Sequence, residues 1–533
     1  MTCGWTSWVG SWAALLSWLA CVGCAPALQS PAAGGRPWYE VQSPHFLIQT
    51  DAGEGVANEL TSEYERLVAF FEQQVFVASR QPSGFTRLVM FSDERDFRQL
   101  APRLSTGYFR KEGGAPYDPH PTIVVPQRAS NAEILETFRH ELTHRYVAFH
   151  FPSAPAWLNE GLATYFQTVL FDGNKARMGL LPVHDLQLGK PRKGLDSPGW
   201  VALTASGLEA LDALPSSGQI RALSDRDFYA RDVGDSIEAS TARQLHYIAA
   251  WAQVHQLMLG SDDLQSRFMR YLNALGTGRE EAWATSFDAE AERALEAEYR
   301  ELFKHSTFRG GELPAPALAA NRAPVRSMAA WEVHWLWAAL RNLDRPEERE
   351  RARRDIERCI ELAPDRADGY TLRAALQVEE KKRREARDSV ELALRHEPND
   401  ANALGVKAFL LLGEVDQKGP NASAFRELEQ AMSALEPVAK NSRQWLMLAR
   451  YHKLRGNVSR ALQCALRSTQ DSSCWPCYWA AGDMHLARGD VVHAARYLRM
   501  AVSLAEQWAP PALRQTLADV LARSECQGTP SKC

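Results

Sequence analysis

Two short stretches of sequence decide the fold of the first half of the chain. Residues 140–144 read His-Glu-Leu-Thr-His, and residues 155–163 read Pro-Ala-Trp-Leu-Asn-Glu-Gly-Leu-Ala. The spacing of apolar side chains predicts one helix over residues 131–149 and a second helix that begins at Ala156. The turn between them is short and rich in proline, so the two helices are expected to run antiparallel and to bring their side chains together.

The first stretch has the spacing of a metal-binding helix. His140 and His144 lie one turn apart on one helical face, so both imidazoles can hold the same ion. Imidazole nitrogen is a common ligand of Zn²⁺, and Glu141 is placed to take a proton from water at the metal. The pattern also arises by chance, and such histidines can equally be surface residues or hydrogen-bonded core residues.

The second stretch supplies a third ligand. Glu160 stands among Trp157, Leu158 and Leu162 in a largely apolar helix, where an unpaired carboxylate is costly. Binding a metal across the two helices compensates for that cost. Two histidines, one glutamate and an open position make up the ligand set of a catalytic zinc site, so we expect one Zn²⁺ at this site.

Taken together, these stretches resemble the gluzincin-type zinc metallopeptidases, nearest to the peptidase MA-like families of exported bacterial proteins. The likeness covers about residues 38–304 and includes Ser-Pro-His-Phe-Leu-Ile-Gln-Thr at residues 43–50. It implies an α+β, thermolysin-like zincin domain in which His140, His144 and Glu160 bind zinc and Glu141 is the general base.

The resemblance has two further implications for the site. Tyr247 stands where the superfamily places a hydrogen-bond donor for the transition state, although a helical tyrosine more often serves packing. An edge strand above the zinc helix is expected to hold an extended peptide substrate, and residues 122–125 are our candidate for it.

Around this centre the sequence alternates strand and helix signals. Short β-rich runs occupy residues 45–50, 87–91 and 122–125, and an amphipathic helix is predicted over residues 59–79. After Pro155 the signals are almost wholly helical, an order typical of an α+β domain. Residues 305–327 contain prolines and a glycine pair without periodicity, so a separable interdomain linker is predicted there.

The last part of the chain repeats. Pro364 and Pro398 close two helical units 34 residues apart, and Trp445 and Trp479 open two others with the same separation. This period resembles tetratricopeptide repeats, and four to five units are predicted within residues 328–525. Such an all-α solenoid is expected to bind a protein partner. Cys474 and Cys477 lie between repeat helices, which favours a stapling disulfide that involves them or Cys464 over a redox site.

The N-terminus is predicted to be an export signal. Residues 8–22 form an apolar run, and Val-Gly-Cys at residues 22–24 resembles a bacterial lipobox. Residues 1–24 are therefore expected to be a signal peptide, with Cys24 as a membrane tether, and residues 25–37 a flexible linker. Cys21, a plain cleavage site and an uncleaved anchor remain alternatives. Each of these routes places the protein in a bacterial cell envelope or outside the cell.

Composition limits the class of function. The chain has 533 residues, 45% of them hydrophobic and 24% charged, and carries a formal net charge of −4. These values are typical of globular domains, and the absence of a basic excess argues against a nucleic-acid partner. The leading hypothesis is an exported zinc metallopeptidase that acts on a peptide or protein substrate. Its rival is a non-catalytic envelope scaffold whose peptidase fold is inert or only binds metal.

Overall fold

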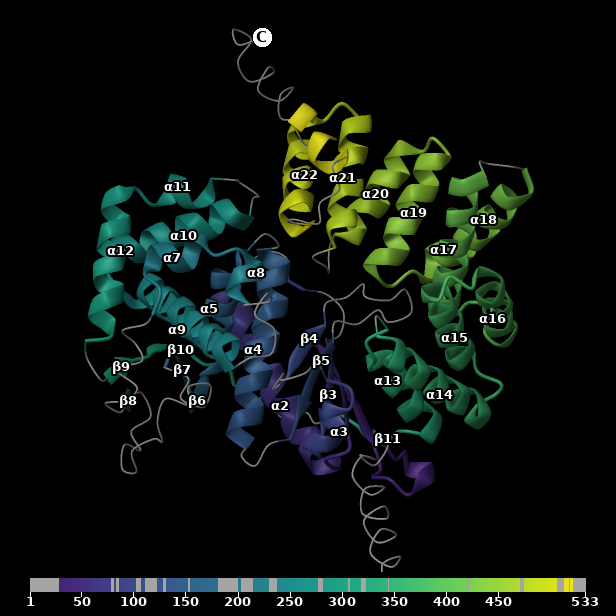
Figure 1. Ribbon diagram of the computed structural model, residues 1–533, viewed down its shortest axis with the longest axis horizontal. Coiled ribbons are helices and arrows are strands. Elements are labelled where there is room, and N and C mark those ends of the chain that lie inside the picture. Colours follow the sequence, from purple (N-terminus) through teal and green to yellow (C-terminus); the bar gives the residue numbers. More distant parts are fainter. Residues whose placement is uncertain are drawn as a thin grey trace, which may run out of the picture.

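The computed structural model is mostly helical, with a mixed sheet in its first half and an arc of helix pairs beside it (Figure 1). It describes residues 28–77, 81–82, 86–101, 107–110, 122–127, 131–151, 154–180, 200–202, 214–229, 237–276, 281–304, 307–317, 323–343, 345–418, 422–469, 474–505, 512–516 and 518–520. The predicted signal peptide and Cys24 lie outside these residues. None of the helices in the described ranges is long and apolar enough to span a bilayer.

The main sheet has six strands in the order β11–β1–β2–β3–β5–β4. Strand β3 pairs in parallel with β2 and β5, and the other three pairings are antiparallel. The strand bounds are Tyr39–Gln42 for β1, Phe46–Thr50 for β2, Thr86–Phe91 for β3, Tyr108–Arg110 for β4, Thr122–Pro126 for β5 and Val325–Ser327 for β11. The three strands predicted from β-rich runs are present, each shifted by at most one residue at either end.

The predicted substrate-binding edge is not at the edge of the sheet. Strand β5, which contains residues 122–125, pairs with β3 on one side and β4 on the other. The outermost strand is β4, so the assignment of the edge to residues 122–125 is wrong. An interior strand is apolar on both faces and therefore gives a stronger sequence signal than a short edge strand.

The two faces of the sheet bury different partners. Leu88 and Met90 of β3 belong to a core shared with helices α2 and α4, whereas Val89 and Phe91 face the opposite side. Helix α2 spans Glu54–Phe70 and continues as a π-helical turn over Phe71–Val75. The helix predicted over residues 59–79 is therefore present but begins five residues earlier and ends four residues earlier.

The remaining helices of the first half extend from this core. Helix α4 contains His140 to His144 and α5 contains Glu160, so the two helices predicted from these stretches are present. The helix bounds are Glu94–Arg98 for α3, Asn131–His150 for α4, Ala156–Gln167 for α5, Ser217–Ala222 for α7, Asp225–Phe228 for α8, Ile237–Leu259 for α9, Asp262–Gly276 for α10, Ala282–Ser286 for α11 and Ala289–Leu302 for α12.

The range predicted as a linker is built into the sheets. Within residues 305–327 lie β9 (Thr307–Arg309), β10 (Gly311–Pro314) and β11. Strand β10 pairs with β7 (Lys175–Met178), which also pairs with β6 (Leu170–Asp172), and β9 pairs with β8 (Trp200–Ala202). The structure therefore differs from the expectation of a separable linker, because β11 closes one edge of the main sheet on β1.

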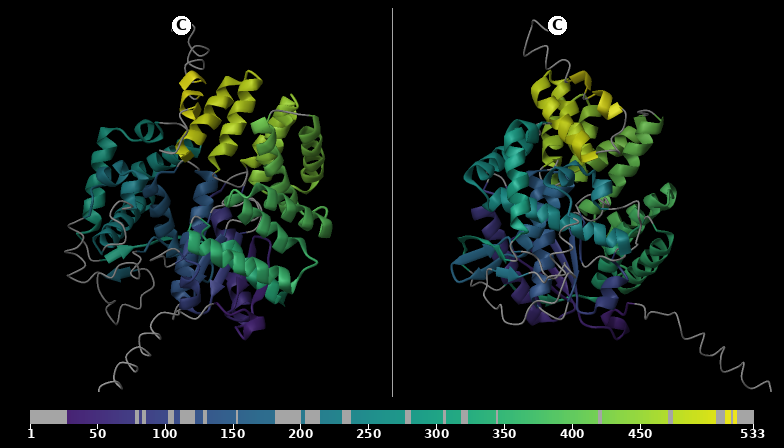
Figure 2. Two further views of the ribbon diagram at one scale, coloured as in Figure 1. Left: turned by 45° about the vertical axis from the view of Figure 1, so that its right-hand side comes forward. Right: turned by 60° about the vertical axis from the view of Figure 1, so that its left-hand side comes forward.

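From α13 onward the described chain forms five helical hairpins. Helices α15 and α17 begin at Ala367 and Ala401, 34 residues apart, which is the period read from the sequence. The hairpins consist of α13 (Ala330–Leu340) with α14 (Pro346–Leu362), α15 (Ala367–Glu379) with α16 (Arg383–His396), α17 (Ala401–Lys418) with α18 (Ala422–Leu435), α19 (Ser442–Leu454) with α20 (Val458–Ser468), and α21 (Trp475–Ala487) with α22 (Val491–Ala505). They form an arc, and α21 and α22 lie at its far end from α13 (Figure 2).

The first repeat helix belongs to the core of the sheet domain. Trp337 and Leu336 of α13 are buried with Val89 and Phe91 of β3. The ring centroids of Trp38 and Trp337 lie 6.5 Å apart at a steep angle. Helix α13 thus covers the face of the sheet opposite to α4, and the repeats are joined to the first domain by a shared hydrophobic layer.

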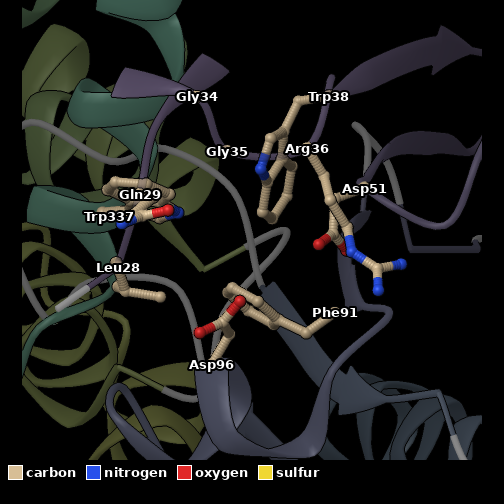
Figure 3. A pocket seen from close by; sticks show the side chains of 10 residues that line it. All are labelled: Leu28, Gln29, Gly34, Gly35, Arg36, Trp38, Asp51, Phe91, Asp96 and Trp337. Carbon is tan, nitrogen blue, oxygen red and sulfur yellow. The ribbon is translucent and has the colours of Figure 1, made fainter. Parts of the chain in front are cut away.

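The end of the predicted tether also packs against this junction. Leu28 contacts the apolar cluster of α13, and Ser30 is buried. Figure 3 shows Leu28 and Arg36 at a cavity of about 260 Å³ that is also lined by Trp337. The described part of residues 25–37 is therefore anchored at Leu28 and Ser30 and includes a short 3-10 helix, although most of its other residues are exposed, where the sequence predicted a flexible linker.

One disulfide joins the cysteines at the start of the last hairpin. Cys474 is bonded to Cys477 in the first turn of α21, and Cys464 and Cys359 are buried free thiols. The staple expected in this region is therefore present, and it leaves Cys464 unbonded.

Candidate metal centre

His140 and His144 meet on the inner face of α4. The Nδ1 atom of His140 lies 2.8 Å from Gln167 Oε1, and that of His144 lies 3.0 Å from Asn159 Oδ1. Each amide oxygen accepts a hydrogen bond from Nδ1, which leaves the Nε2 atom of each ring for another partner. Fixing the outer nitrogen in this way is how proteins orient histidine ligands of metals.

Glu160 brings a carboxylate oxygen to both histidines. Its Oε2 atom lies 3.2 Å from His140 Nε2 and 3.5 Å from His144 Nε2. For comparison, four ligands placed tetrahedrally at about 2.0–2.1 Å from a zinc ion stand about 3.3–3.4 Å apart. The three side chains are only 18%, 12% and 6% exposed. The predicted ligand atoms therefore converge on one buried point with the separations that a metal ion requires.

The state of Glu160 indicates that a cation fits this point. Its Oε2 atom is buried and has no hydrogen-bond partner within the described ranges. Burial alone raises the pKa of this carboxyl, but His144 and His140 outweigh that effect and hold the pKa of Glu160 well below its usual range. Without a metal the two imidazoles compensate this buried charge, and a cation bound between them and Oε2 can take over that role.

Helix α5 holds Glu160 in place because its surroundings are close-packed. Every residue of α5 except Asn159 is buried. A Cβ atom on Gly161 would stand 2.6 Å from the Ala250 carbonyl oxygen, so only glycine lets α9 approach α5 this closely. The Glu-Gly pair therefore combines a ligand with the small residue that packs the ligand's helix.

Tyr229 completes the carboxylate's environment and was missed in the sequence. Its hydroxyl donates a 2.6 Å hydrogen bond to Glu160 Oε1. Burial, followed by the charge of Glu160, raises the pKa of Tyr229 well above its usual value, so the hydroxyl keeps its proton. The imidazole of His246 donates to the Phe228 carbonyl oxygen over 2.7 Å, which fixes the backbone next to Tyr229.

Tyr247 lies at the same end of the site without joining the ligand set. It is half-buried on α9, and its ring centroid is 5.8 Å from that of Phe228. Tyr247 is also close enough to Tyr229 for the two phenol groups to interact electrostatically. The structure thus brings Tyr247 near the metal centre, while the tyrosine in contact with a ligand is Tyr229.

Glu141 follows the first histidine on α4. Burial raises the pKa of its carboxyl, and the neighbouring His144 and His140 oppose that shift. The three residues whose ligand atoms lie close enough together to hold a metal ion are His140, His144 and Glu160. The four residues predicted from the two stretches, His140, Glu141, His144 and Glu160, therefore lie together in the fold.

Comparisons with known proteins reach only coarse likenesses. No family model and no curated protein matches the sequence. Among solved structures, the chain is similar to a thermophilic tetratricopeptide protein of Thermus thermophilus, with 16% identity and a TM-score of 0.29 over 36% of this chain and 99% of the other. It is also similar to PilF of Pseudomonas aeruginosa, with 15% identity and a TM-score of 0.27 over 38% and 92% of the two chains. For yeast Tom70 the identity is 12% and the TM-score 0.29, over 56% and 63%.

Proposed function

We propose that the protein is an exported, zinc-dependent metallopeptidase. The observation that carries the proposal is the convergence of His140 Nε2, His144 Nε2 and the unpartnered Glu160 Oε2 at one buried point. When bound there, a zinc ion supplies Lewis acidity toward a peptide carbonyl oxygen and toward water. Two imidazoles and a carboxylate leave one coordination position open, as catalytic zinc sites do.

The chain's own residues supply the proton transfers and the positioning. Glu141 accepts a proton from the attacking water and then gives that proton to the leaving amine. Gln167 and Asn159 hold the two imidazoles in the ligating tautomer. Tyr229 holds the carboxylate of Glu160 in one orientation, which fixes where the ligand atom Oε2 points.

Strand β4 is the proposed docking edge for the substrate. It is the last strand in the order of the described sheet, next to β5, and it contacts α4. An extended peptide that pairs with this edge through its backbone would run beside the helix that carries the histidines. Such pairing selects an extended conformation more than a particular side-chain sequence.

The repeats are proposed to hold a protein, either the substrate or a partner that localises the enzyme. The support is the stack of five hairpins, an architecture that presents an extended concave surface. The cell-envelope location and the lipid tether at Cys24 rest on the sequence of the N-terminus. A Cys24→Ser protein that loses lipid labelling and leaves the membrane fraction supports the tether, and unchanged membrane retention rules it out.

The experiment that tests the activity combines metal analysis with digestion of an unbiased peptide library. We expect wild type to cleave in a chelator-sensitive manner, and His140→Ala to contain one zinc fewer and to be inactive. Glu141→Gln is the matched control, because it retains the metal and the shape of the site but lacks the proton acceptor. Zinc binding without cleavage in wild type favours the non-catalytic scaffold. Full cleavage by Glu141→Gln refutes the mechanism.

A further inference from the structure

A second group of potential metal ligands lies in the fourth repeat hairpin. The short 3-10 turn Glu436–Val438 follows α18, and its Glu436 side chain forms ion pairs with His452 of α19 and Arg460 of α20. It carries Glu436, while α19 carries His452 and α20 carries Cys464. One ligand atom from each of these three residues lies within 4.8 Å of the others. None of them takes part in the proposed peptidase mechanism.

His452 has a nitrogen that needs a partner. Its Nε2 atom is buried and has no hydrogen-bond partner in the part of the chain that the structure describes. The Glu436 Oε2 atom lies 3.4 Å from it. Leaving a buried ring nitrogen unsatisfied is costly, so the nitrogen is either a packing defect or a ligand.

Cys464 is the third member and is unused elsewhere. Its thiol is free, and the residue is fully buried. Thiol sulfur, imidazole nitrogen and carboxylate oxygen together form a donor set suited to Zn²⁺ and other thiophilic divalent ions.

The carboxylate is already held in a ligating position. Arg460 donates to Glu436 Oε1 over 2.7 Å, which orients the carboxylate and leaves Oε2 directed at His452. A surface cavity of about 550 Å³ is lined by Glu436, Arg460 and Trp445. Of the three proposed ligands only Glu436 lines this cavity, so an ion would reach the cluster from the side of Glu436.

Another cluster of potential ligands, in the last hairpin, differs from the Glu436 cluster because its histidine nitrogens already have partners. His485 and His493 each place Nδ1 about 3 Å from Asp490, at distances of 3.1 Å and 3.0 Å. Asp490 also accepts from the backbone N–H of His493 at the start of α22. The Nδ1 atoms of His485 and His493 thus have a hydrogen-bond partner in Asp490. In the Glu436 cluster, by contrast, His452 Nε2 has none among the described residues.

We propose that Glu436, His452 and Cys464 form a second, structural zinc site that fastens α19 and α20 to the turn after α18. Binding forms a bond from Cys464 Sγ to the ion, breaks the S–H bond and releases that proton to solvent. The site ties the third hairpin to the fourth, and it is independent of the peptidase centre.

Cobalt distinguishes the two sites, because only this one contains sulfur. The full chain, stripped of metal by a chelator and kept free of reductant, is titrated with Co²⁺ alone. We expect two Co²⁺ per chain and a thiolate-to-cobalt charge-transfer band in the near ultraviolet. Cys464→Ser should bind one Co²⁺ fewer and lose the band. Cys359→Ser, which removes the other buried free thiol, is the matched control and should keep both.

If Cys464→Ser does not fold, a second variant and a measurement on wild type still test the proposal. His452→Gln retains the thiol and should weaken Co²⁺ binding at this site by about tenfold or more, because even residues that only support ligands matter that much. Zn²⁺ should also slow alkylation of Cys464 in wild type. Absence of the band in wild type, or a band of equal strength in Cys464→Ser, overturns the proposal. Neither result depends on peptidase activity.

Discussion

Replacing Glu160 by glutamine tests whether this side chain is a metal ligand. The amide has nearly the same shape, and its oxygen can still accept the hydrogen bond that Tyr229 donates to Oε1. Its nitrogen then faces the two Nε2 atoms, which lie 3.2 Å and 3.5 Å from Oε2 in wild type. A neutral NH₂ group has no lone pair available for a metal, so the variant keeps its packing and loses one ligand.

The expected loss of stability follows from the linkage between zinc binding and folding. Free zinc at about 1,000 times its dissociation constant stabilises the folded protein by about 4.1 kcal/mol. If the lost ligand weakens binding by about 100-fold, the same free zinc stabilises Glu160→Gln by only about 1.4 kcal/mol. Glu141→Gln should retain the full gain, since Glu141 is not one of the three ligand atoms, while its turnover falls by about 10²–10⁴-fold.

Urea denaturation with buffered zinc and with chelator measures these gains directly. The second proposed zinc site is present in all three proteins, so its contribution cancels in the comparison. An equal zinc-dependent gain in wild type and Glu160→Gln would refute the assignment of Glu160 as a ligand. If Glu141→Gln and Glu160→Gln lose the same part of the zinc-dependent stabilisation, the roles of base and ligand are misassigned.

Three other predictions follow from contacts around the site and the sheet. Tyr229→Phe should lower zinc affinity or activity by about 10–100-fold, as is usual for a residue that orients a ligand, and Tyr247→Phe should leave zinc affinity unchanged; zinc titration of both decides this. Trp337→Ala should lower the free energy of unfolding by about 3–5 kcal/mol. Because α13 shares the core of the sheet, the unfolding transitions of the first domain and of the repeats, each followed by its own spectroscopic probe, should shift together. The hydrogen bond that the His45 imidazole donates to the Glu65 carboxylate raises the pKa of His45. That contribution is complete below about pH 6.5 and is lost as the pH rises through the folded pKa, so His45→Gln should cost about 0.5–1 kcal/mol near pH 5.5 and less near pH 9 in denaturation experiments.

The convergence of His140, His144 and Glu160 was predictable because its signals are local. His140 and His144 are one helical turn apart, and Glu160 follows after a short turn, so helix geometry alone brings them together. Tyr229 was not predictable in this way. It lies 69 residues from Glu160 in the sequence, and only the packing of α8 against α5 brings its hydroxyl to the carboxylate.

The strands in the expected linker show the same limit. Strands β9, β10 and β11 have three or four residues each, and their partners lie far away in the chain. A short run with proline and glycine carries no alternation long enough to indicate a strand. Its pairing is decided by strand edges that form elsewhere, which is information that a local pattern does not contain.

The pairing of β1 with β11 has a consequence for how the chain is made. Tyr39 pairs with Ser327, so the sheet closes only after 288 further residues have been synthesised, and α13 follows β11. Contacts of such long range form slowly, and the apolar strands stay uncovered in the meantime. During synthesis the first domain therefore stays incomplete, with one edge of its sheet unpaired, until β11 and the first repeat have been made.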